Sequence, residues 1–362
     1  AAELEEKVMN WLREMIGIPD TFEGVIQDTA STATLVAFLT AREKASGWRI
    51  NEEGYSGNEK FRIYSSTEAH SSIEKAVFMA GFGRKNLVKI EVDEALAIRP
   101  EKLEEAIEAD LRSGLKPLCV VAAMGTTGTV AIDPLKPLAW ICRKYDIWLH
   151  IDAAYAGSAL VLPEQRGMLE GIEDADSFVF NPHKWMFTNF DCSAYYVRDV
   201  EALIRTFEIL PEYLKTGTRG QVNDYRDWGI QLGRRFRALK LWFVIRDYGV
   251  EGIREKIRDH LKWASELAEK IREHDDFELY EPQHLGLVCF RFCPPGQSDT
   301  EKLNRLNHEL MKRLNASGRM YLTHTRVGGR VMLRMVVGQT QVTRNHVMNA
   351  WKRVCETSNK LQ

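Results

Sequence analysis

The sequence has no apolar run long enough to cross a membrane and no block of charge of one sign. A spanning helix needs about 20 consecutive apolar residues, and the 362 residues contain no such stretch. The formal net charge is only −2, with both signs interspersed along the chain. We therefore expect no membrane segment and no nucleic-acid partner. Residues 1–15 are acidic and lack the apolar core of a signal peptide, which predicts a cytoplasmic protein.

Cysteine is also sparse, and it is not arranged for disulfides or metal. Six cysteines occur, and none forms a CxxC pair. This usage is typical of buried free thiols in a reducing compartment. Cys289 and Cys293 are spaced closely enough to share a metal, but no second Cys or His pair at zinc spacing accompanies them. We therefore interpret them as strand thiols and predict no metal site.

Internal repeats, low-complexity tracts and Pro/Ser-rich linkers are absent as well, and short apolar runs alternate with helical patterns instead. This alternation predicts an α/β protein with a large doubly wound, mostly parallel sheet buried on both faces. Strands are expected at residues 61–65, 87–92, 118–124, 147–151, 177–180 and 193–197, with helices at 32–42, 71–81, 101–112 and 135–145.

Beyond Gly233 the pattern changes, which indicates a second and smaller unit. A chain of this length is expected to form two domains. We place the large domain at residues 1–240 and a small C-terminal α+β domain at residues 241–362. The small domain is expected to contain long helices at 234–248 and 253–274, strands at 285–292 and 331–337, a helix at 300–314 and a final helix.

Parallel sheets bind ligands at the carboxyl ends of their strands, so the residues that follow each strand are the candidates for chemistry. Asp152 follows the strand at 147–151, where a carboxylate can keep a ring nitrogen protonated, although a helix cap is the commoner role of a lone Asp. Lys184 follows the next strand. Most lysines are solvated surface groups, but the aromatic residues around Lys184 favour a partly apolar site in which a lysine can attack a carbonyl.

Two further segments contain groups that bind anions or flat rings. The hydroxyls of Thr29 and Ser31, at the start of a helix, are suited to a phosphate, although Ser and Thr cap many helices. The turn at residues 125–128 offers further hydroxyls to the same ligand. His70, between a strand and a helix, is placed to stack on a heterocycle, or simply to cap the helix or fill the core.

A nicotinamide cofactor is excluded by the one glycine-rich segment. Gly81 and Gly83 resemble half of a dinucleotide fingerprint, but Asn86 occupies the third glycine position. A lysine for a Schiff base, a carboxylate for a pyridine nitrogen, a phosphate cradle and a stacking imidazole are together the groups that pyridoxal 5′-phosphate requires. The sequence therefore predicts this cofactor, held covalently by Lys184.

In several long stretches the chain resembles the group II pyridoxal-phosphate decarboxylases, specifically the aromatic-L-amino-acid decarboxylase branch. Glutamate and cysteine-sulfinate decarboxylases share the His-Lys pair but differ after it. The resemblance implies a fold-type I pyridoxal-phosphate transferase fold, similar to aspartate aminotransferase. It also implies a homodimer in which both subunits border each cofactor. The matching stretches are His150–Ser158, Asn181–Trp185, Asn189–Ala194, Asp224–Trp228 and Leu232–Arg237.

By position, the resemblance implies a role for each site residue. Lys184 is the cofactor lysine, Asp152 the partner of the pyridine nitrogen and His70 the ring stacked over the cofactor. Tyr213 falls on the catalytic tyrosine of a mobile loop; relatives with phenylalanine there make aldehydes, so tyrosine implies simple decarboxylation. The remaining cofactor contacts are implied for Thr29, Ala30, Ser31, Thr127, Ala154, Asn181 and His183.

The expected activity is decarboxylation of an aromatic L-amino acid, of the tryptophan, tyrosine or dopa type, to the amine and CO2. Trp185 and the stretch at 189–192 favour aromatic substrates, and Gly233 is compatible with an indole ring. A histidine decarboxylase, an aromatic aldehyde synthase and a weakly active cofactor-binding chain stay open as alternatives. Family members are expected to carry a helical segment ahead of the residue at which this sequence begins. The resemblance implies that this segment supports substrate recognition, turnover and dimer stability, whereas cofactor binding does not require it.

Overall fold

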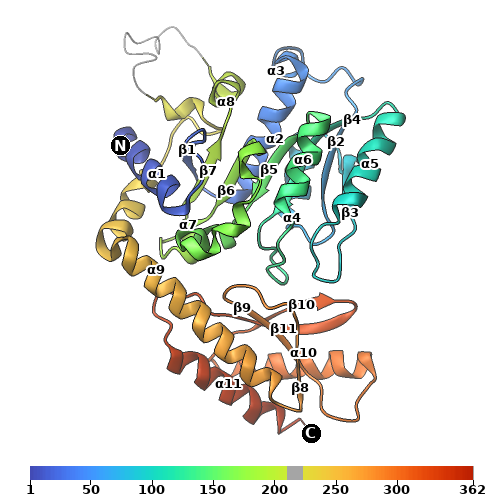
Figure 1. Cartoon of the computed structure of the whole chain (residues 1–362), viewed down its shortest axis with the longest axis vertical. Helices are drawn as coiled ribbons and strands as arrows, with labels where there is room; N and C mark the ends of the chain where they lie inside the picture. The colour runs from blue at the N-terminus through green and yellow to red at the C-terminus, as the bar shows by residue number, and fades with distance from the viewer. Residues whose placement is uncertain (210–222, 362) are drawn as a thin grey trace. The chain divides into compact units, whose positions relative to one another are not determined.

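The computed structural model describes residues 1–209 and 223–361 (Figure 1). The chain forms two compact units. The first, called here the large unit, contains residues 1–126 and 132–253; the second, the small unit, contains residues 127–131 and 254–362. The division predicted between residues 240 and 241 falls inside a helix, α9 (Arg237–Arg272), and stays a prediction.

The large unit is built on a seven-stranded sheet with the order β1-β7-β6-β5-β4-β2-β3. Strand β7 runs antiparallel to both of its neighbours, and all other adjacent pairs are parallel. The prediction of a mostly parallel, doubly wound sheet is therefore confirmed. The strands are β1 (Glu23–Gln27), β2 (Phe61–Ser66), β3 (Leu87–Ile90), β4 (Lys116–Ala123), β5 (Trp148–Asp152), β6 (Ser177–Phe180) and β7 (Ser193–Val197).

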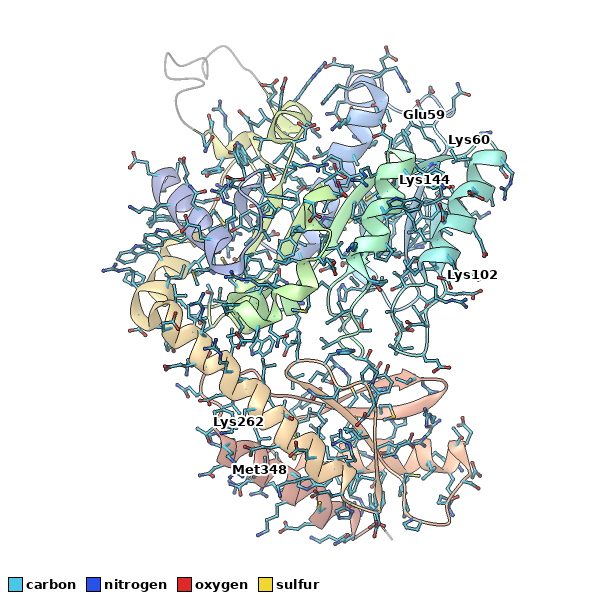
Figure 2. All side chains as sticks on the ribbon, in the orientation of Figure 1. Glu59, Lys60, Lys102, Lys144, Lys262 and Met348 are labelled. Carbon is cyan, nitrogen blue, oxygen red and sulfur yellow. The ribbon has the colours of Figure 1, made fainter. Side chains whose placement is uncertain are left out.

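Helices cover both faces of this sheet (Figure 1). They are α1 (Ala2–Ile16), α2 (Ala30–Ser46), α3 (Arg49–Glu53), α4 (Ser71–Met79), α5 (Pro100–Arg112), α6 (Leu135–Tyr145), α7 (Pro182–Trp185), α8 (Val200–Phe207) and the first part of α9. Short 3-10 turns occur at Arg84–Asn86, Ala156–Val161, Pro163–Leu169, Ile172–Asp174 and Tyr225–Asp227. The outer helices are amphipathic. On α5, Leu103 and Ile107 are buried, while Lys102 on α5 and Lys144 on α6 extend outward (Figure 2).

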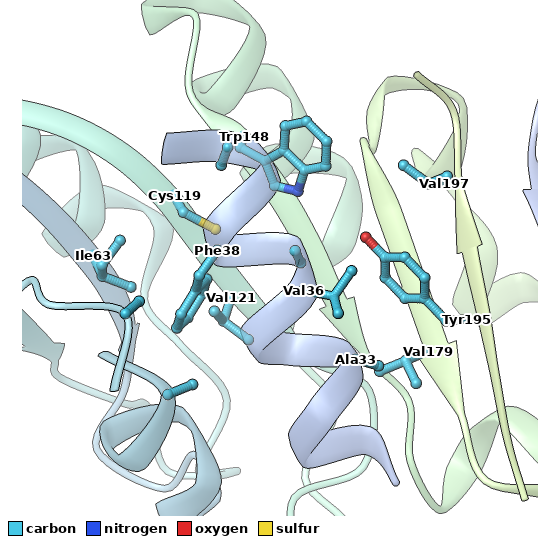
Figure 3. Packing of buried hydrophobic residues seen from close by; sticks show 14 of the residues in the cluster. Ala33, Val36, Phe38, Ile63, Cys119, Val121, Trp148, Val179, Tyr195 and Val197 are labelled. Carbon is cyan, nitrogen blue, oxygen red and sulfur yellow. The ribbon is translucent and has the colours of Figure 1, made fainter. Parts of the chain in front are cut away.

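Helix α2 forms the centre of the large core. Small and apolar side chains along it allow close approach to the sheet, and Ala33, Val36 and Phe38 are fully buried. Figure 3 shows α2 crossing the central strands, beside Val121 and Tyr195. Because each fully buried aliphatic or aromatic side chain contributes about 1.5–3 kcal/mol, this contact holds the start of α2 firmly at the edge of the sheet.

The small unit packs helices on a four-stranded antiparallel sheet with the order β10-β11-β9-β8. It contains the end of α9, β8 (Phe277–Leu279), β9 (Leu287–Phe292), α10 (Thr300–Ala316), β10 (Thr323–Val327), β11 (Arg330–Val336) and α11 (Arg344–Ser358). Alternate residues of β9, such as Phe290 and Phe292, enter its core. Helix α9 is interrupted at Gly249, where φ is 65°, between the two long helices that the sequence predicts.

The sequence patterns did not predict seven of the described helices and strands. These are the helices α1, α3, α7 and α8 and the strands β1, β8 and β10. Each strand is short, and β1 and β10 carry exposed polar residues at one end, so their apolar pattern is weak. Within the described residues, no helix combines the length and apolar character needed to span a membrane.

Candidate active site

The carboxyl ends of β2, β5 and β6 meet at one edge of the large sheet, and β1 ends at the same edge because two antiparallel pairings lie between it and β6. Asp152 is the last residue of β5 and pairs in register with Val179 of β6. The loop that carries Lys184 begins two residues beyond Val179. The two residues predicted to do chemistry therefore lie on neighbouring strand ends.

Lys184 lies in α7, a single turn of helix that starts with Pro182. Proline fits the first helical position, where its missing N–H is not needed, and the Lys184 N–H is bonded to the Asn181 carbonyl at 2.9 Å. The side chain reaches solvent, but protein atoms crowd its ammonium group. The resulting loss of hydration lowers the pKa of Lys184, while the negative charge of Asp152 acts in the opposite direction. A lowered pKa makes the neutral, nucleophilic amine more accessible.

Asp152 has one carboxylate oxygen held by the backbone and one left open. Its Oδ1 accepts a hydrogen bond from the Ala154 N–H at 3.0 Å. Among the described residues, none donates a hydrogen bond to Oδ2. The Ala154 carbonyl in turn accepts from the Asn181 N–H at 3.0 Å. One short turn thus fixes Asp152 and connects it to the loop of Lys184.

Thr29 caps α2 and begins the predicted phosphate cradle. Its Oγ1 accepts from the Thr32 N–H at 3.4 Å, and its own N–H donates to Asp28 Oδ1 at 2.5 Å. The N–H groups of Ala30 and Ser31 have no acceptor in the described part of the chain. A helix start with unpaired N–H groups attracts anions, because the partial positive charge of the helix dipole adds to the donors.

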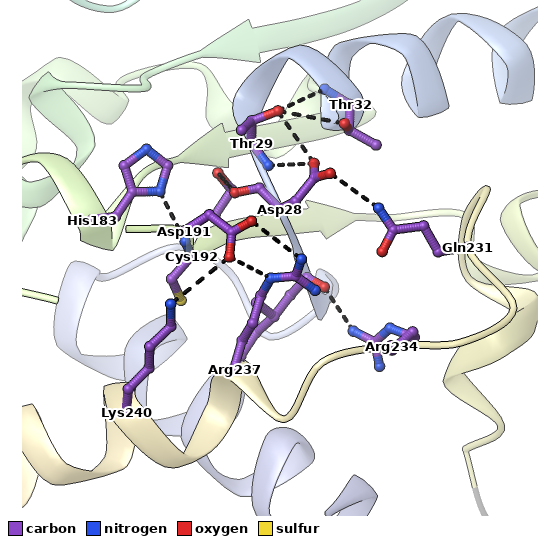
Figure 4. Close-up of polar contacts among 12 residues, drawn as sticks. Asp28, Thr29, Thr32, His183, Asp191, Cys192, Gln231, Arg234, Arg237 and Lys240 are labelled. Carbon is purple, nitrogen blue, oxygen red and sulfur yellow. Dashed lines mark hydrogen bonds and ion pairs between the residues drawn. The ribbon is translucent and has the colours of Figure 1, made fainter. Parts of the chain in front are cut away.

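A single hydroxyl connects this helix start to the loop of Lys184. Ser193 Oγ lies 2.5 Å from Asn181 Oδ1 and 3.3 Å from the Asp28 carbonyl. Asp28 is also held from the other side by Gln231, whose Nε2 donates to Asp28 Oδ2 at 3.0 Å (Figure 4). The cradle and the lysine loop are therefore tied together through β7.

His183 is fixed in the same loop as a neutral donor. Its Nδ1 accepts from the Cys192 N–H at 2.9 Å (Figure 4), and its ring packs edge-on against Phe190. Burial and the nearby positive charge of Lys184 lower the pKa of His183. Since Nδ1 accepts, the neutral ring carries its proton on Nε2, which is a hydrogen-bond donor for an anionic ligand.

This geometry agrees with the comparison to known proteins. The model of the pyridoxal-dependent decarboxylase conserved domain matches residues 1–293. The chain belongs to the pyridoxal-dependent decarboxylase family.

Similar proteins cover the whole chain. Tryptophan decarboxylase 2 of Oryza sativa subsp. japonica is 42% identical over 371 residues, covering 100% of this chain and 74% of the relative. Phenylacetaldehyde synthase of Arabidopsis thaliana is 40% identical, covering 100% of this chain and 75% of the relative. The crystal structure of Oryza sativa TDC with PLP and tryptamine matches with a TM-score of 0.95 and 38% identity, covering 99% of this chain and 76% of that one.

Three of the predicted site residues stay less defined in this decarboxylase. His70 caps α4 and is exposed: its Nδ1 accepts from the Ser72 N–H at 3.2 Å, so its stacking role stays a prediction. Thr127 belongs to the small unit, where its carbonyl accepts from Arg334 Nη2 at 2.6 Å. Its contact with the cofactor also stays a prediction. Tyr213 lies outside the described residues.

Trp185 has a different role from the one that its place beside Lys184 suggests. Its side chain is completely buried and stacks on Tyr155, with ring centroids 4.8 Å apart and planes 6° from parallel. A buried ring of this kind supports the α7 turn from below and offers no surface to a substrate. The link between Trp185 and aromatic substrates, which was inferred from the sequence pattern, stays a prediction.

Several charged residues near the site were not assigned a role from the sequence. Asp191 accepts from Arg237 Nε at 3.0 Å and lies 3.8 Å from Lys240 Nζ (Figure 4). Nearby, Arg234 Nη2 lies 2.5 Å from Glu5 Oε1. Two of the stretches that carry the family resemblance, 189–194 and 232–237, thus meet in an ion pair. The resemblance marked these stretches, but only the folded chain shows that they contact each other.

Proposed function

We propose that this protein uses pyridoxal 5′-phosphate to decarboxylate an aromatic L-amino acid to the amine and CO2. The observation that carries the proposal is the placement of Lys184 and Asp152 on neighbouring strand ends, with the lysine pKa lowered and one aspartate oxygen open. The relatives named as tryptophan and tyrosine decarboxylases support an aromatic substrate.

The described residues fit this cofactor at three points. Asp152 Oδ2 is free to accept from a protonated ring nitrogen, Lys184 has an amine without a hydrogen-bond partner among the described residues, and the start of α2 offers unpaired N–H groups to a phosphate. When bound, pyridoxal 5′-phosphate supplies an electron sink for the bond that breaks. We assign cofactor binding to Thr29, Ala30, Ser31, His70, Thr127, Asp152, Ala154, Asn181, His183 and Lys184.

The chain's own residues perform three tasks in this reaction. Lys184 would hold the cofactor through its amine, and its lowered pKa favours the neutral form of the amine that can do so. Asp152 keeps the ring nitrogen protonated by offering it a negative charge. Tyr213, or a group that it orients, delivers a proton to the α-carbon after CO2 leaves.

An aldehyde synthase is the second candidate, because phenylacetaldehyde synthase of Arabidopsis thaliana is among the similar proteins. Tyrosine at position 213 favours the decarboxylase. The test is a panel of tryptophan, tyrosine, dopa and histidine, with CO2, amine, aldehyde, ammonia and peroxide measured for each. Amine and CO2 in equal amounts from an aromatic substrate support the proposal, and aldehyde with peroxide would replace it. Amine from histidine alone would identify a histidine decarboxylase.

A single substitution tests the assignment of Tyr213. In Tyr213→Phe, assayed in air, we expect the product to change from amine toward aldehyde, because the proton donor for the α-carbon is gone. Dioxygen is then the oxidant and is reduced to hydrogen peroxide, and water releases the nitrogen as ammonia. Tyr145→Phe, which removes a hydroxyl from α6 on the outer surface, is the control and should leave the product unchanged. If Tyr213→Phe forms only amine at the normal rate, the assignment is wrong.

We also propose that the protein is a cytoplasmic homodimer. Large exposed apolar surfaces on soluble proteins commonly mark interfaces. Phe236, Leu239 and Phe243 have the spacing of one helical face and are all exposed, and Ile230 and Leu232 precede them in the chain. A second copy covering this face would bury these side chains. Light scattering should give twice the mass of the chain, and Phe243→Glu should shift the population toward the monomer.

A further inference from the structure

A buried histidine, His150, lies in β5 directly below the candidate site. Its side chain is completely inaccessible to solvent, as are Thr34 of α2 and Ser177 of β6. His150 Nδ1 is 2.9 Å from Ser177 Oγ, and His150 Nε2 is 3.3 Å from Thr34 Oγ1. The imidazole therefore bridges the sheet and α2. Figure 3 shows α2 lying across this part of the sheet, beside Trp148.

The direction of every hydrogen bond in this cluster is fixed by its two ends. At one end, the indole N–H of Trp148 can only donate, and Ser177 Oγ accepts from it at 2.9 Å. At the other end, the Ala30 carbonyl can only accept, and the Thr34 hydroxyl donates to it at 2.9 Å. Since the single hydrogen of Thr34 is used, its Oγ1 must accept from His150 Nε2–H.

This arrangement selects one form of the imidazole. With its proton on Nε2, His150 accepts from the Ser177 hydroxyl at Nδ1, and each hydroxyl donates once and accepts once. Burial lowers the pKa of His150 to about 4, against the opposing charge of Asp152, so the ring is neutral at physiological pH. The result is a continuous chain of hydrogen bonds that runs from Trp148 to Ala30 in one direction.

The two ends of the candidate site are connected through this ring. Ala30 is the first residue of α2, and its N–H belongs to the phosphate cradle. Asp152 lies two residues after His150 on the same strand, so both side chains point to the same face of the sheet. The bond from His150 to Thr34 therefore sets how far the start of α2 lies from Asp152.

We propose that His150 is a positioning residue for the phosphate of the cofactor. Its Nε2–H fastens Thr34 of α2 to β5, and the Thr34 hydroxyl in turn holds the Ala30 carbonyl. These two bonds keep the N–H groups of Ala30 and Ser31 at a fixed distance from Asp152. A rigid cofactor bound at both its phosphate and its ring nitrogen requires a constant distance between the start of α2 and Asp152. The role rests on the proposed binding of pyridoxal 5′-phosphate and assigns no chemistry to His150 itself.

The test compares two probes that differ only in the phosphate. The protein, freed of cofactor, is titrated with pyridoxal 5′-phosphate and with pyridoxal, and the two dissociation constants are measured. Thr34→Val keeps the shape of the side chain but removes the acceptor for His150 Nε2–H. We expect about tenfold weaker binding of pyridoxal 5′-phosphate, as for a lost buried hydrogen bond, with pyridoxal binding unchanged.

Two matched variants separate positioning from general damage. Thr34→Ser restores the hydroxyl and should bind both probes like the wild type. Ser177→Ala removes a hydroxyl from the same buried cluster but keeps the bond between His150 and Thr34, so its ratio of the two dissociation constants should stay at the wild-type value. Melting temperatures are recorded for all variants, since Thr34→Val and Ser177→Ala should lose similar stability.

The outcomes distinguish the two proposals. A Thr34→Val protein that binds both probes with the wild-type ratio would overturn the positioning role while leaving the cofactor assignment intact. An equal change in the ratio of the two dissociation constants in Thr34→Val and Ser177→Ala would also overturn the positioning role. The change would then follow the loss of stability that both variants share. A wild-type protein that binds neither probe would overturn the proposed function and this role with it.

Discussion

The large unit contains two groups of charged residues, and they differ in whether the opposite charges are bonded to each other. In the strand-end site, Asp152 has one open oxygen and Lys184 has a lowered pKa, with no hydrogen bond between them. In the paired region, Asp191 is bound by Arg237, and the exposed fractions of their side chains are 13% and 6%. Hydrogen bonds from Arg237 lower the pKa of Asp191. An aspartate and a basic residue can therefore bind a ligand in the strand-end site, whereas in the paired region they bind each other.

This difference separates reactive charge from structural charge. A buried charge is costly unless hydrogen bonds and an opposite charge satisfy it, and the paired region meets that condition. In the strand-end site, hydrogen bonds and opposite charges satisfy the charged groups only in part. A ligand with a cationic ring and an anionic end would supply the missing partners. Both groups lie in stretches that carry the family resemblance, so resemblance alone does not tell them apart.

The largest expected effect is the loss of Lys184. Lys184→Ala should abolish covalent attachment of the cofactor, because the variant lacks the amine that lies beside Asp152 on the neighbouring strand end. The visible absorbance of the bound cofactor and all release of CO2 should disappear. Lys144→Ala, on the outer surface of α6, is the control and should change neither signal. Unchanged absorbance in Lys184→Ala would refute the assignment of the attachment site.

Asp152→Asn should have the next largest effect. The amide cannot hold a proton on the ring nitrogen by charge, and loss of one electrostatic stabiliser of this kind lowers rates by about a hundredfold or more. The cofactor should still bind and absorb, since Lys184 and the cradle are intact. Asp174→Asn, at the opposite edge of the sheet, serves as the control. CO2 release within a few fold of the wild type would contradict the role of Asp152.

Breaking the paired region should reduce stability rather than chemistry. Arg237→Met removes the main hydrogen-bond partner of the partly buried Asp191 carboxylate and leaves Lys240 Nζ 3.8 Å away. We expect a loss of about 1–3 kcal/mol of unfolding free energy, as for a hydrogen bond to a charged group. Urea denaturation measures the loss, and the double variant with Asp191→Asn should recover much of it. If the double variant is as unstable as the two single losses combined, the two residues do not act as a pair.

The smallest expected effect is a pH dependence of the stability that the pair of Asp191 and Arg237 contributes. Because the pKa of Asp191 is lower in the folded state than in the unfolded state, the pair stabilises the protein above the unfolded value of about 3.9. Its contribution is lost as the pH falls through the folded pKa. The difference in unfolding free energy between the wild type and Asp191→Asn should therefore be constant from pH 7 to about pH 5 and shrink below about pH 4. A constant difference down to pH 3 would show that Asp191 gains nothing from its charge.

Local pattern was sufficient for most of the fold. The helix at Leu135–Tyr145 and the strands at Ser177–Phe180 and Ser193–Val197 have the predicted bounds, because apolar periodicity and flanking turn residues specify them within a few residues. The pattern could not predict that β7 runs antiparallel to its neighbours. Both of its faces are buried, and a strand of either direction would show the same apolar run. The place of β1 at the sheet edge depends on the same long-range pairing.

Sequence by itself determined which groups follow the strands, and therefore the cofactor and the family. Lys184, Asp152 and the hydroxyls before α2 are local features, and the strand-end rule collects them without coordinates. Only the tertiary structure decided which charged side chains are paired within the protein and which are left to bind a ligand. It also placed Trp185 in the core. The physical reason is that burial and hydrogen bonding depend on partners far away in the chain: Glu5 for Arg234, Asp191 for Arg237, and Thr34 for His150.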